Sequence, residues 1–155
     1  MSERPPYQRL MPMGPPGLEE ICHCAEVDTI YLVFDFRENP LHCGICRGIV
    51  APERIAFPLD LVDALADWTA SFGAIYALWL QSGAYESWAY GELADPDSAV
   101  HREGLALTRA ISAHRPCAYL WFWYERRPER CPICTSEFEL LPHRFRHCAA
   151  CHVLA

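Results

Sequence analysis

Two cysteine pairs near the end of the sequence constrain the fold more than any other feature. They are Cys131-Pro-Ile-Cys134 and Cys148-Ala-Ala-Cys151, with thirteen residues between them. A C-x-x-C pair on a tight turn directs two sulfurs to one point, and two such pairs at this separation are typical of a tetrahedral zinc site. Because four thiolates leave no coordination position for a substrate, we expect a structural site. The intervening residues are predicted to form a short β-hairpin.

A second cysteine group lies closer to the start of the chain. It consists of Cys22-His-Cys24 and Cys43-Gly-Ile-Cys46, which are separated by eighteen residues. Four sulfurs can meet here as well, so we expect zinc to bind. The sequence leaves open whether the two groups hold one ion or two, and whether a nearby histidine replaces a thiolate. The histidines concerned are His23, His143, His147 and His152.

Two other cysteine chemistries compete with zinc. Cys148-Ala-Ala-Cys151-His152 fits the attachment motif of c-type haem, but haem would leave Cys131 and Cys134 without a partner. The Cys43 pair fits a redox dithiol, but such a pair opens a helix after a strand, whereas β-type sequence follows here. Zinc explains the most cysteines and is the favoured cofactor. Cys117, alone in an apolar segment, is expected to be a core residue.

Hydrophobic patterning predicts an α+β protein in which zinc-ribbon β-hairpins from both chain ends pack on two or three central helices. Apolar residues recur at helical spacing in the first helix, which is expected to start at Leu59 and to end at Gln81-Ser82-Gly83. Two further helices are expected over 85–93 and from 95–98 to about His114. The predicted strands are 27–36, 48–57 and 117–124, the last of them buried.

The expected domain organisation is a flexible Pro-rich arm over 1–20 and a single zinc-stabilised domain over 21–155. That domain would comprise an N-terminal cysteine region (22–57), a helical middle (58–115) and a C-terminal strand with its ribbon (117–155). Residues 1–20 have no apolar stretch typical of a signal peptide, and no run has the length of a membrane span. We therefore expect a cytoplasmic protein with reduced, metal-bound thiols.

The charge distribution suggests a basic partner. The formal net charge is −7, and all 13 basic residues are arginine. Residues 55–101 contain seven carboxylates, many aromatic residues and no arginine. One interpretation is a solvated acidic face over an aromatic core. The sharper one is a binding face for a basic protein, with aromatic anchors among carboxylates. The predicted partner-binding residues are Asp63, Asp67, Tyr85, Glu86, Trp88 and Glu92.

Nucleic-acid binding is the alternative function. Five arginines flank the C-terminal cysteines: Arg126, Arg127, Arg130, Arg144 and Arg146. They can contact phosphates, although the negative net charge opposes long-range attraction to a polyanion. We expect no enzyme, because the sequence contains no Gly-rich phosphate loop, no H-E-x-x-H motif and no nucleophile elbow.

The sequence resembles an uncharacterised bacterial family described as containing a zinc ribbon and as a candidate for nucleic-acid binding. The segments that carry this resemblance are 39–46, 49–57, 78–93, 95–98 and 119–151. The resemblance implies zinc-binding cysteine turns, which in that family often have glycine after the second cysteine; here Arg47 and Thr135 occupy those places. The small size, acidity and ribbon are also similar to immunity proteins that neutralise a cognate toxin. That similarity implies a basic toxin as the partner.

Overall fold

The computed structural model of the chain describes residues 10, 17–35, 39–142 and 144–155. Most of the predicted Pro-rich arm lies outside the described residues, and so does His143. Leu10 is fully buried in the core, and residues Leu18–Glu20 form a short 3-10 helix, η2.

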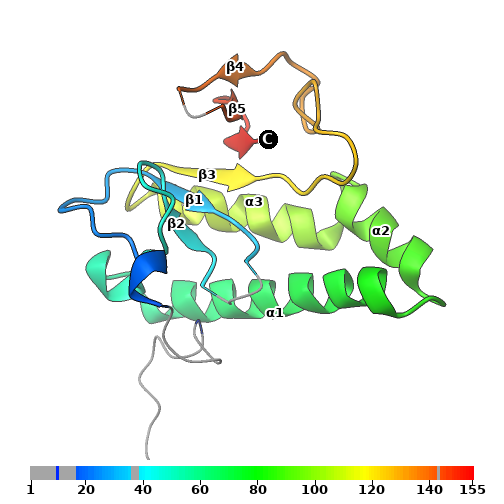
Figure 1. The fold of residues 1–155 in the computed structure, drawn as a ribbon, viewed down its shortest axis with the longest axis horizontal. Coiled ribbons are helices and arrows are strands. Elements are labelled where there is room, and N and C mark those ends of the chain that lie inside the picture. Colours follow the sequence, from blue (N-terminus) through cyan, green and yellow to red (C-terminus); the bar gives the residue numbers. More distant parts are fainter. Residues whose placement is uncertain (1–9, 11–16, 36–38, 143) are drawn as a thin grey trace, which may run out of the picture.

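Both cysteine regions join one six-stranded sheet with the order β2-β1-β3-β6-β5-β4 (Figure 1). The central strands β1, β3 and β6 run parallel, and the three outer strands pair antiparallel to their neighbours. The strand bounds are Ile30–Leu32 (β1), Leu41–Cys43 (β2), Cys117–Leu120 (β3), Glu139–Leu140 (β4), Arg146–Cys148 (β5) and Val153–Leu154 (β6). The predicted α+β fold with ribbon-like ends on central helices is confirmed, and so is the hairpin between the C-terminal cysteine pairs.

The three predicted helices are present with ends close to those expected. They are α1 (Leu59–Gln81), α2 (Glu86–Ala94) and α3 (Ala99–Ser112). Pro58 precedes the first residue of α1, and Gly83 follows its last turn with a φ of 62°, a conformation that glycine adopts without strain. Ser98 caps α3 by accepting a hydrogen bond from the backbone N–H of His101. In the described part of the chain, no helix combines the length and the apolar character needed to cross a bilayer.

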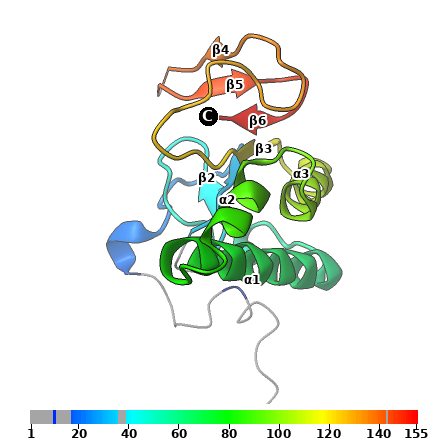
Figure 2. The same ribbon diagram turned by 90° about the vertical axis from the view of Figure 1, so that its right-hand side faces the viewer.

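The main core lies between α1, α3 and one face of the sheet. The predicted stripe of α1 is buried at Trp68 and Phe72, and the Trp68 indole donates a hydrogen bond to the carbonyl of Val100 in α3 at 2.9 Å. A Cβ at Gly104 would lie 2.8 Å from the Tyr119 ring, so glycine allows α3 to approach β3. In Figure 2, α1 lies at the opposite end of the molecule from β4 and β5.

The second face of the sheet carries a smaller apolar cluster. Alternation along the strands sends Tyr31, Ala118 and Leu154 to this face, away from the helices. The ribbon covers it with Phe145, whose ring meets the Tyr31 ring edge-on at 5.6 Å. The Arg47 guanidinium in turn lies 4.7 Å from the centroid of the Phe145 ring. The two cysteine regions are therefore in direct contact.

The strand predictions need correction. No strand forms over 48–57: Ile49 makes only isolated bridges, and Pro52–Arg54 form a 3-10 helix, η3, because proline cannot donate to a sheet. The predicted strand 27–36 shortens to β1. The predicted strand 117–124 leaves the sheet after Leu120, because Phe122 packs against aromatic rings of α1 instead.

Candidate metal centres and an aromatic pocket

The structure brings the eight predicted cysteine ligands together in two groups of four. Within each group, all sulfur atoms lie within 4.8 Å of one another. A tetrahedral zinc ion with Zn–S bonds of ~2.3 Å would separate its sulfurs by about 3.8 Å, so each group fits one ion. The N-terminal cluster is Cys22, Cys24, Cys43 and Cys46, and the C-terminal cluster is Cys131, Cys134, Cys148 and Cys151.

The C-x-x-C turns of the two clusters share one backbone conformation. The N–H of Arg47 donates to the carbonyl of Cys43 at 2.9 Å, and the N–H of Thr135 donates to the carbonyl of Cys131 at 2.9 Å. Arg47 and Thr135 have φ values of 63° and 61°, in the left-handed region that favours glycine. Both turns therefore adopt this conformation with arginine or threonine, and not glycine, after the second cysteine.

Close backbone packing explains how the Cys22-x-Cys24 pair reaches the N-terminal cluster despite its short spacing. A Cβ at Gly48 would lie 2.7 Å from the backbone nitrogen of Cys22, so only glycine allows the two segments to approach. The Arg54 guanidinium then fixes the pair by donating hydrogen bonds to the carbonyls of Cys22 and Cys24.

The thiols of the C-terminal cluster differ in their pKa values. Hydrogen bonds from the hydroxyl and the backbone N–H of Ser136 lower the pKa of Cys134 to about 6. Burial raises the pKa of Cys131 and of Cys151. Four thiolates cannot coexist here unless a cation neutralises them, and a divalent metal ion would do so. Sulfur-only donors in a closed tetrahedral set fit structural zinc.

The remaining cysteine and the nearby histidines stand apart from both clusters. Among the described residues, only cysteines form the two groups. His23 and His152 are exposed and His147 is half-buried. Cys117 is buried in β3, where burial raises its pKa to about 12, which confirms the prediction of a core cysteine.

The last turn of α1, α2 and the segment after β3 lie at one end of the molecule (Figure 1). Exposed aromatic side chains are concentrated on α2 and on the segment after β3. We call this surface the aromatic end. In the described chain, it holds every exposed tyrosine and tryptophan: Tyr85, Trp88, Tyr90, Trp123 and Tyr124. The predicted partner-binding residues Tyr85, Glu86 and Trp88 lie here. Asp63 and Asp67 do not, because Asp67 precedes Trp79 by about 18 Å along α1.

The aromatic end contains a pocket of about 320 Å³. The Trp79 ring lies 4.9 Å from the Tyr124 ring and 6.1 Å from the Tyr90 ring, measured between centroids. The pocket is lined by Trp79, Glu86, Ser87, Tyr90, Tyr124 and Glu125. The sequence analysis missed Tyr124 as a surface residue because it placed 117–124 in a buried strand, and it assigned no role to Glu125. The charged sequence Glu125-Arg126-Arg127, which directly follows Tyr124, could have indicated that this end of the segment is exposed.

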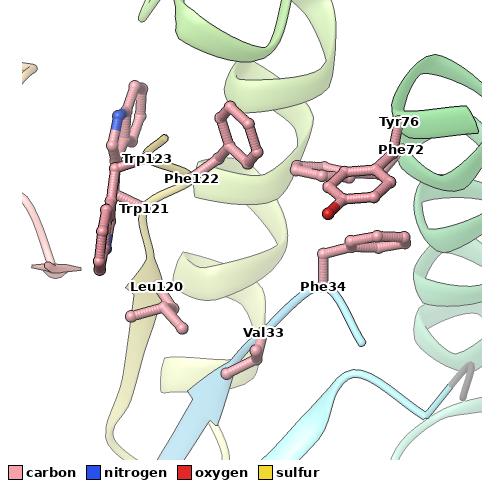
Figure 3. A pocket seen from close by; sticks show the side chains of 8 residues that line it. All are labelled: Val33, Phe34, Phe72, Tyr76, Leu120, Trp121, Phe122 and Trp123. Atoms are coloured by element: carbon pink, nitrogen blue, oxygen red, sulfur yellow. The ribbon is translucent and has the colours of Figure 1, made fainter. Parts of the chain in front are cut away.

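A neighbouring apolar pocket of about 240 Å³ opens beyond the carboxyl ends of the parallel strands β1 and β3 (Figure 3). The Phe34 ring stacks on the Phe72 ring with 4.4 Å between centroids. Phe122 contacts both Phe72 and Trp79, so it lies between this apolar pocket and the pocket of the aromatic end. The described residues that line the apolar pocket carry no charge, whereas two glutamates line the pocket of the aromatic end.

Two of the five arginines predicted for nucleic-acid contact tie separate segments of the C-terminal region together, and a third forms an ion pair at the surface. Arg127 donates hydrogen bonds to the backbone oxygens of Arg144 and Ala155. Arg146 donates to the carbonyl of Pro128 at 2.8 Å, and Arg130 pairs with Glu137. The side chains of Arg126 and Arg144 are exposed.

The fold and the two cysteine clusters define an α+β protein of the metal-binding, zinc-ribbon type. Residues 22–124 match DUF2310, a domain of unknown function, and the chain belongs to this family. The match includes the N-terminal cluster, all three helices and Tyr124, and it ends before the C-terminal cluster. No curated protein and no solved structure matches the chain. The predicted similarities to immunity proteins and to nucleic-acid-binding proteins stay predictions.

Proposed function

We propose that this chain is a zinc-stabilised protein-binding module, and not an enzyme, whose aromatic end binds a basic protein. The observation that carries the proposal is the concentration of exposed aromatic side chains around a carboxylate-bearing pocket. Tyr85 and Trp88 are 61% and 53% exposed, a large apolar area to leave in water. Tyrosine and tryptophan are the residue types that most often dominate binding energy at protein interfaces.

Charge supports a basic partner rather than an acidic one. Glu86 and Glu125 line the pocket, and residues 55–101 contain no arginine or lysine. The formal net charge of −7 becomes more negative by about two for each zinc held by four thiolates. Such a surface raises the rate of association with a positively charged partner and rejects acidic ones. In its sharpest form, the partner is a basic toxin and the chain is its immunity protein.

The zinc clusters have a supporting role in this proposal. Each cluster offers four sulfur ligands to one ion and leaves no open position for a substrate. Nucleic-acid binding is the weaker alternative, because Arg127 and Arg146 already donate to backbone carbonyls and Arg130 is paired with Glu137 at the surface. Arg126 and Arg144 provide too few contacts to overcome the net negative charge.

A site-specific photo-crosslinker tests the proposal in the native host. A benzophenone amino acid would replace Trp88 in the aromatic end or, as a control, Arg102 on α3, which is also exposed. We expect position 88 to yield one dominant adduct, with a protein of basic isoelectric point, that position 102 does not yield. Equal adduct patterns from the two positions, or an acidic partner, would contradict the proposal.

A further inference from the structure

The geometry of the aromatic end points to a specific ligand group. We propose that the pocket between α1, α2 and the segment after β3 binds the guanidinium group of an arginine side chain in the partner protein. This inference rests on the proposed function, since it names the chemical group that the aromatic end recognises. We call the pocket the guanidinium pocket.

The aromatic rings provide the first part of the argument. Trp79, Tyr90 and Tyr124 come from three different elements and line one pocket. A cation near the face of tryptophan or tyrosine is attracted by the ring quadrupole, and arginine engages such rings more often than lysine does. The pocket volume of about 320 Å³ accommodates a flat guanidinium with part of its aliphatic stem.

The carboxylates distinguish arginine from other cations. Glu86 and Glu125 line the same pocket as the rings. A guanidinium presents five N–H donors in a plane, so it can stack on an aromatic ring and donate to a carboxylate at once. A quaternary ammonium has no N–H donor, and a lysine ammonium is more strongly hydrated. Arginine is therefore the cation that uses every group of the pocket.

The segment after β3, which contributes Tyr124 and Glu125 to the pocket, has an unusual backbone conformation. Glu125 has a φ of 59°, in the left-handed region, which is costly for a residue with a side chain. The N–H of Arg126 donates to the carbonyl of Tyr124 at 2.6 Å and closes a tight turn around Glu125. This turn places Tyr124 and Glu125 together in the pocket, whereas Arg126 does not line it.

Titration with blocked amino acids tests the inference without the partner. The probe is Nα-acetyl-arginine methylamide, with the lysine analogue as comparison, and the readout is the NMR signal of the Trp79 indole N–H. We expect the arginine probe to shift this signal and to bind at least tenfold more tightly than the lysine probe. No shift, or equal affinity for the two probes, would overturn the inference.

Matched variants separate recognition from general charge attraction. The Glu86→Gln/Glu125→Gln variant should lose at least tenfold in affinity for the arginine probe. The control Glu53→Gln/Glu103→Gln removes the same two charges from exposed positions outside the pocket, and it should change affinity by less than twofold. Equal losses in both variants would show only long-range attraction, which contradicts a specific site.

Two further measurements identify the source of the guanidinium and separate the inference from the proposed function. Propylguanidine, a free guanidino compound with the same single positive charge as the arginine probe, should bind no more tightly than that probe. If this free compound binds tenfold more tightly than the arginine probe, the ligand is a small guanidino metabolite and the proposed arginine side chain of a protein is wrong. If the crosslink from position 88 persists at full yield in Glu86→Gln/Glu125→Gln, the guanidinium pocket is wrong while the protein-binding function stands. If the crosslink falls with the probe affinity, both are supported.

Discussion

Thr135, which follows the second cysteine of the Cys131–Cys134 turn, has a strained backbone conformation. Thr135 has a φ of 61°, and a β-branched residue is a rare occupant of that region. We therefore expect Thr135→Gly to raise the free energy of unfolding by about 1 kcal/mol, measured by urea denaturation of the zinc-loaded protein. Thr135→Ala is the control and should give no comparable gain, because alanine keeps the Cβ that causes the strain.

His101 is a second residue with a measurable signature. It is fully buried, and its Nε2–H donates to the Leu93 carbonyl at 2.6 Å while Nδ1 accepts from the Tyr119 hydroxyl at 2.8 Å. Because that carbonyl only accepts hydrogen bonds, Nε2 carries a proton. Burial lowers the pKa of His101 below its usual value of 6.5. The ring therefore links α2, α3 and β3 in its neutral form.

The lowered pKa of His101 predicts how stability depends on pH. The unfolded chain binds a proton at this residue below about pH 6.5 and the folded chain does not, so stability is full above that pH and falls as the pH decreases. The slope is about 1.4 kcal/mol per pH unit for one histidine. His101→Phe should be destabilised by about 2 kcal/mol at pH 7.5, because the Leu93 carbonyl and the Tyr119 hydroxyl lose their partner. This difference from the native protein should shrink towards pH 5.5 in urea titrations; a constant difference would contradict a neutral buried ring.

Helices were predictable from the sequence, and strands were less so. α1 carries an apolar stripe over many turns and α3 has a serine cap, so local pattern alone determines both. The strands have two to four residues each, and their hydrogen-bond partners come from distant parts of the chain. β2 was not predicted because it has only three residues and its last residue, Cys43, begins the cysteine turn. The guanidinium pocket could not be predicted because its walls meet only after α1, α2 and the segment after β3 pack together.

Cysteine spacing predicted the two groups of four sulfurs, because a C-x-x-C turn is a local structure. The two clusters use separate sulfur sets, so we expect two zinc ions that can be removed one at a time. Cys134→Ser should lower the zinc content in native mass spectrometry from two to one, and Cys46→Ser should do the same. A drop to zero in either variant would contradict separate sites.

Loss of the C-terminal zinc should loosen the ribbon more than the helices. β6 pairs with β3 on one side and with β5 on the other, so the β3–β6 pairing connects the C-terminal hairpin to the rest of the sheet. The Arg127 hydrogen bonds to the backbone oxygens of Arg144 and Ala155 connect the same region to the segment after β3. Hydrogen exchange of Cys134→Ser should therefore accelerate over β4, β5 and β6 and change little over α1 and α3. Uniform acceleration across the chain would indicate that the ribbon and the helical core unfold together.

The arrangement of the parts predicts that only one zinc cluster supports the guanidinium pocket. Tyr124 and Glu125 lie just before Arg127, which is anchored to the ribbon, whereas the N-terminal cluster lies beside β2 and contributes no residue to the pocket. Cys134→Ser should therefore weaken binding of the arginine probe at least threefold. Cys46→Ser, which removes the exposed second cysteine of the corresponding turn in the N-terminal cluster, should change it by less than twofold. Equal weakening in both variants would mean that zinc acts through overall stability. No weakening in either would mean that the pocket does not need the ribbon, because the turn at Glu125 would then hold Tyr124 in place alone.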